Sequence, residues 1–449
     1  MQLTTRATRI ACATALTLFG FLGAARGGPS AAGAGVPSSG LDGWSPIDAP
    51  STLTSTSASL SAPSPAPSAS EVPEDPSPAS TAPARPARTI ETHLSSEIAF
   101  YGDDDHVFVL SPTIGATLTD PIAGWSATGR YLVDLVSAAS ADIVSAASPN
   151  YREMRQVGSG EVSYKPHTFG VSANANVSIE PDYHSYTGGG SLTQDFYDKN
   201  LTALLAYSHG HDIAGRTGTS FDVFSRVLDV ESFKGGATML LNRSSLLSLV
   251  GDYVYEHGDP SKPYRYVPLF APGVDVPLGA SAAQVAELRT PVRVLEQLPL
   301  SRLRYAVTAH YARRYDASTF RADERIYTDS WGLHASTTDA RWLFDVSRRM
   351  EVGPHFRFHA QTAVDFWQRA FTLDAPNDYP ALRTGDRELG PLLSGTAGGT
   401  LRLAIGSDAT PRSWIFGVDV NLNETRYLDD LYLTNRIAFF GAFTLETEQ

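Results

Sequence analysis

The sequence predicts an all-β protein: a transmembrane antiparallel up-and-down β-barrel of about sixteen strands (range about 12 to 16), preceded by a disordered Pro/Ser/Ala-rich segment. Two observations carry this prediction. From Thr89 to Leu445, apolar and polar residues alternate in runs of about 10 to 15 residues, long enough for a tilted strand to cross a bilayer. The longest gaps between runs fall on every second connection, as expected if all long loops lie at one end of a barrel.

The alternation is clearest in the runs 414–423, 169–180 and 356–365. Successive side chains of a strand point to opposite faces, so each of these strands has one apolar face and one polar face. In the third run, Phe358 and Val364 lie on one face, and the opposite face carries Arg357, His359, Gln361 and Asp365. Soluble β-sandwiches also alternate, but their strands are usually about 5 to 6 residues long.

Residues 1–25 are predicted to be a cleaved secretory signal peptide. Arg6 and Arg9 precede an apolar stretch over 10–22, and small residues follow it. A transmembrane helix is the weaker interpretation, because about 18 to 20 apolar residues are required for a span. The single cysteine, Cys12, lies within this segment, so the mature chain is expected to contain no thiol or disulfide.

Residues 26–88 are predicted to be a disordered periplasmic tether, followed by the barrel over 89–449. The segment is rich in Pro, Ser and Ala and has almost no large apolar side chains that could offset the entropy of ordering. It is interpreted as a spacer, and contact with a periplasmic partner is the functional alternative.

Composition limits the partners. The net charge of -13 argues against nucleic acid, whose phosphates require clustered Lys and Arg. The expected partners are outer-membrane lipid and lipopolysaccharide, the barrel-assembly machinery and small polar solutes, with a homo-oligomer as a further option. No cofactor is expected. The predicted location is the bacterial outer membrane.

The strand count and the orientation of the chain support each other. The predicted strands are 91–102, 105–119, 125–137, 151–164, 167–181, 185–197, 201–213, 230–242, 245–258, 301–315, 324–337, 340–350, 353–370, 388–405, 412–427 and 432–447. The long gaps 138–150, 214–229, 259–300 and 371–387 all join an odd to an even strand. The opposite connections include the turn-like segments Lys165–His167, Asp198–Asn200, Arg243–Ser244 and Glu351–Pro354. The positions of the long gaps predict long outer loops and termini in the periplasm. The count of about sixteen strands predicts a lumen too wide for side chains to fill.

Polar faces of the predicted strands supply candidate lumen-lining residues. Arg304, His310 and Arg314 share one face of run 301–315, opposite Leu303 and Tyr305. The remaining lumen candidates are Arg357, His359, Asp365, Asp419 and Asn421. Opposed basic and acidic stripes would create a transverse field that selects polar solutes, or the charges would simply pair and stiffen the wall.

A tandem repeat follows the third run. Asp134 and Asp142 each begin a copy of Asp-Leu/Ile-Val-Ser-Ala-Ala-Ser. The repeat could pack into the lumen as a constriction, or form a strand end with a small-residue turn; metal ligation by the two aspartates is a weaker third interpretation.

The longest gap, 259–300, contains Arg265 among several prolines. A loop of this length without strong periodicity is usually functional or disordered. We expect it to fold inward and narrow the pore, with Arg265 near the constriction, so that deletion of residues 268–292 would change conductance.

No catalytic or metal site stands out. His209 and His211 share a face, but zinc usually takes three or four ligands and no second cluster is evident. No Gly-x-Ser-x-Gly motif is present, and the histidines are scattered. The sequence therefore predicts a protein that is not an enzyme.

Several landmarks resemble a family of uncharacterised predicted bacterial outer-membrane β-barrel proteins, a domain of unknown function. They are the Val-Ser-Ala-Ala-Ser repeats, Lys199–Thr202, Lys262–Arg265, Leu298–Arg302, Arg325–Gly332, Gln361–Phe366 and Gly385–Leu389. The resemblance begins at about Thr128 and implies the outer-membrane barrel but no established activity or site residue.

The predicted function is a passive pore or channel for small polar solutes. The alternative is a non-conducting barrel that scaffolds an envelope complex, and a barrel hydrolase is a weaker third class. Conductance of the purified protein would separate the first two.

Overall fold

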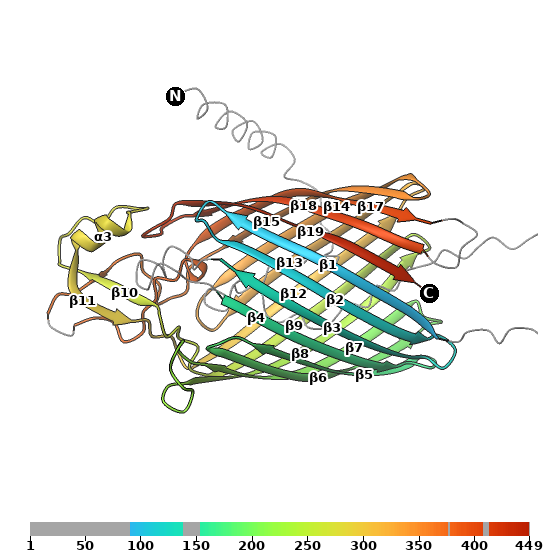
Figure 1. Cartoon of the computed structure of the whole chain (residues 1–449), viewed down its shortest axis with the longest axis horizontal. Helices are drawn as coiled ribbons and strands as arrows, with labels where there is room; N and C mark the ends of the chain where they lie inside the picture. Colours follow the sequence, from blue (N-terminus) through green and yellow to red (C-terminus); the bar gives the residue numbers. More distant parts are fainter. Residues whose placement is uncertain (1–89, 138–152, 376–377, 407–412, 449) are drawn as a thin grey trace, which may run out of the picture.

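The computed structural model describes residues 90–137, 153–375, 378–406 and 413–448. Sixteen strands in these ranges close into one antiparallel barrel (Figure 1). They are β1 (Glu91–Asp103), β2 (Phe108–Asp120), β3 (Trp125–Val136), β4 (Glu153–Tyr164), β5 (Phe169–Ile179), β6 (Tyr183–Phe196), β7 (Leu201–Ala214), β8 (Arg226–Asn242), β9 (Ser245–Gly258), β12 (Ser301–Arg314), β13 (Ser318–Asp329), β14 (His334–Ser347), β15 (Met350–Gln361), β17 (Leu392–Ile405), β18 (Ser413–Tyr427) and β19 (Asn435–Glu448). The predicted fold class and strand number are confirmed.

Pairing between the first and last strands closes the barrel. β1 and β19 are antiparallel over His93–Asp103, with Ala99 opposite Ala442 and Tyr101 opposite Phe440. Every other barrel strand pairs on both sides, so the backbone groups of the wall are satisfied within the sheet. This is the condition for a sheet to span a bilayer, where no water can satisfy an open edge.

The wall has an apolar outer face and a polar inner face. In β12, Tyr305 and Val307 are 45 % and 53 % exposed, whereas the alternate residue Arg304 is 2 % exposed. The same alternation places Trp414 and Leu422 of β18 outside and Asn421 inside. An apolar outer surface of this kind matches the lipid-facing band of an outer-membrane β-barrel.

No helix in the described parts of the chain is long and apolar enough to cross a membrane.

The two ends of the barrel differ in the length of their connections. The ends of β1 and β19 that lead to the chain termini share one end, here called the inner end, with short connections such as 243–244 and 315–317. The longest connections, 137–152, 215–225, 259–300 and 362–391, all lie at the opposite, outer end. The predicted grouping of the long gaps is therefore confirmed.

Two predicted boundaries are wrong, around β13 and β14. The run 324–337 joins the end of β13 to the start of β14 across a turn at 330–333, and Glu351–Pro354 lies inside β15 because the turn is at 348–349. Odd-numbered residues face the lumen in β13, β14 and β15, as Tyr327, Asp339 and His359 illustrate. Cross-strand partners in both hairpins are an even number of positions apart, as Thr328 with His334 and Arg341 with His355. The odd–even alternation therefore continues through both turns and hides them.

A small second sheet lies beyond the outer end of the barrel (Figure 1). It contains β10 (Tyr266–Phe270), β11 (Arg289–Leu295) and β16 (Phe371–Thr372), in the order β11-β10-β16. The helix α3 (Ala282–Leu288) connects β10 to β11 and begins with a capping box between Ser281 and Gln284. The loop predicted to fold inward is 259–300, and its middle part, 268–292, lies in this cap beyond the barrel end instead of in the lumen.

Candidate functional site

Two long loops fill the outer end of the lumen. Their inward parts, residues 259–265, 296–300, 362–370 and 383–391, are here called the outer plug. The described residues of 371–382 include β16 and pack with the cap. An apolar cluster joins the plug to the inner face of the wall; it contains Leu298, Ala306, Tyr327, Trp331, Leu333, Val364, Trp367 and Leu389, each at most 9 % exposed. The plug is therefore packed against the barrel rather than lying over it.

Arg265 ties the two parts of the plug together. Its guanidinium contacts the carboxylate of Asp386 and lies 3.7 Å from that of Glu296. Glu296 is fully buried and also accepts a hydrogen bond from the Thr384 hydroxyl (2.6 Å). The constriction predicted at Arg265 stays a prediction, and the contact of this residue with the 362–391 loop was not predicted.

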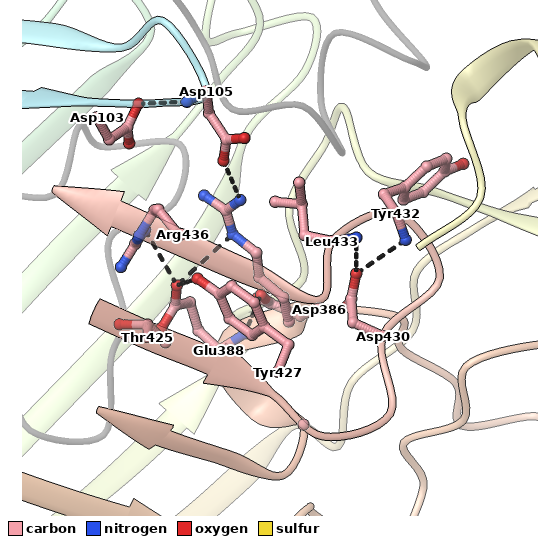
Figure 2. A network of polar contacts seen from close by, with 12 residues as sticks. Asp103, Asp105, Asp386, Glu388, Thr425, Tyr427, Asp430, Tyr432, Leu433 and Arg436 are labelled. Atoms are coloured by element: carbon pink, nitrogen blue, oxygen red, sulfur yellow. Dashed lines mark hydrogen bonds and ion pairs between the residues drawn. The ribbon is translucent and has the colours of Figure 1, made fainter. Parts of the chain in front are cut away.

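A second network fixes the plug to the rim of the barrel (Figure 2). Arg387 donates a hydrogen bond to Asp105 of the β1–β2 turn (3.0 Å), and its neighbour Glu388 accepts one from the Tyr427 hydroxyl (3.4 Å). The Arg436 guanidinium lies 3.7 Å from the same Glu388 carboxylate. Burial raises the pKa of the Asp105 carboxyl, while the Arg387 guanidinium acts in the opposite direction. The plug is thus held from both sides of the β1–β19 closure.

Buried ion pairs hold the wall beneath the plug. Arg302 donates to the Asp329 carboxylate (2.9 Å from Nε), which also accepts from the Tyr327 hydroxyl (2.9 Å). Arg304 pairs with Glu256, and each side chain is 2 % exposed. Charges buried to this degree require partners, because an isolated charge in the interior costs several kcal/mol or more.

A small cavity remains between the plug and the wall. Its volume is about 60 Å³, and its lining includes Asp212, Tyr183, Glu256, Arg304 and Lys262. A water occupies roughly 10 to 15 Å³ on this measure, so the space is sufficient for a few waters. Leu228, Leu298 and other apolar side chains line it together with these charged groups, so it is a gap of mixed character in the closure.

The inner part of the lumen has two chemically different walls. On β2–β9, hydroxyl pairs bridge neighbouring strands, among them Thr117 with Thr128 (3.0 Å) and Ser172 with Ser191 (2.8 Å). On β12–β15 most of the lumen-facing residues are charged or histidine, among them Arg302, Asp323 and Asp339. The two walls provide neutral and charged contacts to whatever polar solute occupies the lumen.

Seven of the predicted lumen residues face the interior at positions in the wall. His310 and Arg314 are paired with Asp323 and Asp345, respectively. His359 accepts or donates with Thr337 (2.8 Å), and Asn421 Oδ1 lies 2.8 Å from the Nδ1 of His355. Arg304 pairs with Glu256, as described, and Asp419 lies 4.0 Å from Arg341.

Arg357 also lies on the lumen face of β15, in register with Asp339. The structure therefore brings acidic and basic candidates together as cross-strand neighbours. It does not separate them into two uniform opposed stripes.

The prediction for Asp365 is wrong in one respect: the residue is not on a strand. β15 ends at Gln361, and the chain then turns inward, where the Asp365 backbone N–H donates to the carbonyl of Trp331 (2.8 Å). Val364, predicted to face lipid, is 2 % exposed within the plug. Alternation continues past the end of the strand because the plug also alternates between packed apolar and polar residues.

Of the two constriction candidates, Asp134 is at the lumen face of β3. It accepts a hydrogen bond from Ser111 (2.6 Å) and pairs with Arg155 (3.2 Å), and it is 2 % exposed. This places it in a wall network. Asp142 and most of the tandem repeat lie outside the described residues, so the constriction remains a prediction.

Among the described residues, no group of three or more His, Cys, Asp or Glu side chains is arranged to hold a metal ion. His209 and His211 lie on the lipid-facing side of β7 and pair with Glu231 and Asp229 of β8. These pairs account for the polarity of the two histidines at the outer rim.

The plug is the main feature that the sequence did not predict. Large aromatic side chains outside strands require burial, so Trp331 and Trp367 could have signalled the plug. The predicted strands 324–337 and 353–370 included both residues, and the signal was therefore missed. The Trp367 indole N–H donates to the Asp386 carbonyl (2.9 Å), and that of Trp331 donates to the Ser301 carbonyl (2.9 Å).

Residues 229–407 match the model of a family described as "Protein of unknown function (DUF3570)", which confirms the predicted family resemblance over that part of the chain. Comparison with curated protein sequences finds no match.

Similar solved structures include the siderophore receptor PirA from Acinetobacter baumannii (12 % identity, TM-score 0.38, covering 75 % of this chain and 53 % of that one). A bacterial polysaccharide outer membrane secretin is also similar (9 % identity, TM-score 0.40, covering 81 % of this chain and 99 % of that one). So is a variant of OccD1 (OprD) (7 % identity, TM-score 0.38, covering 80 % of this chain and 95 % of that one). The chain spans about half the length of the siderophore receptors it matches.

Proposed function

We propose that this protein is a passive pore of the bacterial outer membrane for small polar solutes, with its termini in the periplasm and its mouth narrowed by the outer plug. The observation that carries the proposal is the closed sixteen-stranded barrel with an apolar exterior and a polar interior. Barrels of about this strand number enclose a lumen too wide for wall side chains to fill. A polar lumen of that width favours water and polar solutes over lipid.

The distribution of packing supports a narrowed mouth rather than a fully packed interior. The large apolar cluster of the lumen is confined to the plug and the adjacent wall. Towards the inner end, lumen-facing side chains such as Arg130 and Arg402 are exposed. Exposed charged side chains inside a barrel indicate space for water around them.

The second candidate function is a non-conducting barrel that scaffolds an envelope complex. The density of buried contacts in the plug favours it, because Arg265, Glu296 and Thr384 form a connected buried network. If the plug closes the lumen completely, the barrel would display its cap without passing solutes.

Swelling of liposomes that contain the full-length chain tests the proposal. Neutral sugars of increasing size should enter, with a cut-off set by the plug. A variant in which residues 366–385 are replaced by a short Gly/Ser linker should admit larger sugars, because it removes the part of the 362–391 loop that contains Trp367 and Thr384.

Deletion of residues 268–292 is the matched control. Val267 and Val294 are direct strand partners, so a short Gly/Ser linker between Val267 and Arg293 can close the shortened chain. This deletion removes cap residues only, and the cut-off should not change. If neither the wild type nor the plug variant admits any sugar, the pore proposal is wrong and the scaffold is favoured.

A further inference from the structure

We infer that the lumen wall formed by β13 and β14 is a binding subsite for a zwitterionic solute about the length of a dipeptide. The inference deepens the proposed pore function and rests on it, because the solute must enter the lumen to reach this wall. The residues that carry it are Arg321 and Asp323 of β13 and Asp339 and Arg341 of β14.

These four residues form two like-charged rows. Arg321 lies directly opposite Arg341, and Asp323 lies directly opposite Asp339. All four are on the lumen face, since the outward residues of this hairpin are the intervening ones such as Ile326 and Trp342, which are 55 % and 45 % exposed. The guanidinium row is closer to the inner end of the barrel, because β13 starts there.

The arrangement forgoes an obvious stabilisation. Like charges directly opposite each other on adjacent strands are destabilising, and opposite charges there are stabilising. Exchanging Asp339 and Arg341 along β14 would convert both rows into cross-strand ion pairs. Nearer the outer end of the lumen, opposite charges are paired, as in Arg302–Asp329 and Arg304–Glu256. The ion pairs beneath the plug stabilise the wall, whereas the like-charged rows of the β13–β14 hairpin do not, so wall stability does not explain these rows.

The existing partners neutralise the two rows only in part. Asp323 contacts His310 and Asp339 contacts His355, so each carboxylate faces an imidazole. Asp339 is also in register with Arg357 of β15, and no ion pair joins these two side chains among the described residues. Arg341 lies 4.0 Å from the half-exposed Asp419, which is a long ion pair. No ion pair within the described residues involves Arg321, and the charges that act on it most strongly are those of Glu351, Arg402 and Arg341.

Both rows contain buried polar atoms without a hydrogen-bond partner. These are the Oδ1 of Asp339 and the Nε of Arg341, an acceptor and a donor two residues apart on one strand. The side chains of both residues are 11 % exposed. Charged groups with little exposure to water interact more strongly with a solute than exposed groups do, because the local dielectric constant is lower.

The spacing of the rows defines the ligand. Two residues along a strand correspond to roughly 6.7 Å, close to the roughly 6.6 to 7.2 Å span of an extended dipeptide. A solute carboxylate can accept hydrogen bonds from Arg321 and Arg341, and its ammonium group can donate to Asp323 and Asp339. The solute would lie along β14 with its carboxylate towards the inner end.

Calorimetric titration of the full-length protein in detergent with glycylglycine tests the inference without requiring conduction. Acetate and methylammonium, each carrying one of the two charges, should bind at least roughly tenfold more weakly, since each makes only half of the charged contacts. The decisive variant is the double exchange Asp339→Arg with Arg341→Asp, which preserves composition and net charge. It should weaken glycylglycine binding by roughly tenfold or more.

The matched control is Arg313→Gln, which removes a charge from the lipid-facing side of β12 and should leave the affinity unchanged. Unchanged glycylglycine affinity in the exchange variant, or equal binding of acetate and glycylglycine, would overturn the inference. The swelling assay tests the proposed pore function separately: if no sugar enters, that proposal is wrong, whatever the calorimetry shows about the subsite. Far-ultraviolet circular dichroism and heat-modified gel mobility test whether the exchange variant forms the barrel. If it does not, the single variants Asp339→Asn and Arg341→Gln replace it, and each is expected to weaken glycylglycine binding.

Discussion

Asp329 shows how a single residue can join the wall, a turn and the plug. One carboxylate oxygen accepts from Arg302 and Tyr327, and the other accepts from the backbone N–H groups of Trp331 (2.9 Å) and Leu333 (3.0 Å). Arg302 in turn lies over the Trp331 ring at 4.1 Å. The buried carboxylate therefore fixes the outer turn that the plug packs against.

Replacing Asp329 with Ala should lower the free energy of unfolding by about 3 to 5 kcal/mol, because Arg302 would remain buried without its counter-charge. The measurement is urea-dependent folding into lipid vesicles. Asp345→Ala is the matched control: Asp345 pairs with Arg314 but is 33 % exposed, and an exposed pair contributes about 0 to 1 kcal/mol. Equal losses for the two variants would contradict the account.

Tyr264 links the plug to Asp182 in the β5–β6 connection, and the backbone N–H of Thr217 in the 215–225 loop donates to the Tyr264 hydroxyl. The same hydroxyl donates to Asp182 (2.6 Å), and burial together with this hydrogen bond raises the pKa of the phenol. A raised pKa in the folded state means that the contact stabilises the fold below the ordinary value of about 10 and is lost as the pH rises through the higher folded value.

The difference between the ultraviolet pH titrations of the wild type and Tyr264→Phe isolates this phenol. Its ionisation should occur above pH 10 in the folded protein, and at about 10 in denaturant. Ionisation at or below that pH in the folded protein would show that the hydrogen bond to Asp182 does not form.

Among the elements, a turn could be predicted from sequence only where the odd–even alternation of lumen-facing residues is interrupted or a long gap separates two strands. Outer loops much longer than inner turns were identifiable, as were strands such as β12 and β18 whose apolar faces are continuous. The 330–333 turn was not, because lumen-facing residues stay odd-numbered on both sides of it. The end of β15 was missed for a related reason, since the plug residues that follow it continue the alternation while packing into the barrel.

The 330–333 turn requires a glycine at position 332. Its φ is +85°, and a Cβ there would collide with the Asp365 carboxylate of the plug. Gly332→Ala should therefore destabilise the protein by at least about 1 to 2 kcal/mol and loosen the plug.

Gly395→Ala is the comparison, because a Cβ at Gly395 meets no atom within 4 Å. Protease protection of the 362–391 loop and vesicle folding measure the two effects. If Gly332→Ala matched the wild type in both folding and protease protection, as Gly395→Ala should, the turn would not require a glycine.

For the molecule as a whole, the sequence predicted the fold and the side of each strand better than the site. Period-two alternation depends only on which face contacts lipid, so it is readable one strand at a time. The partners of lumen residues depend on strands far apart in the sequence, as with Arg265 and Asp386, and no local pattern specifies such contacts. Arg304 was placed on the lumen face correctly, but its buried pairing with Glu256 required the register of β9 and β12.

The molecule is asymmetric along the barrel axis. Its outer end contains the packed plug and the cap, and its inner end has short turns and exposed lumen charges. A pore built in this way has its greatest resistance at the outer end. Solute selection would then combine exclusion at the plug with charge recognition on the wall below it.

Single-channel recording of the full-length protein in planar bilayers tests the central claim most directly. We predict discrete conductance steps in the wild type, and larger steps when a Gly/Ser linker replaces residues 366–385 of the 362–391 loop. A correctly folded protein that gives no steps, with or without this part of the loop, would contradict the account of a water-filled lumen narrowed at its outer end.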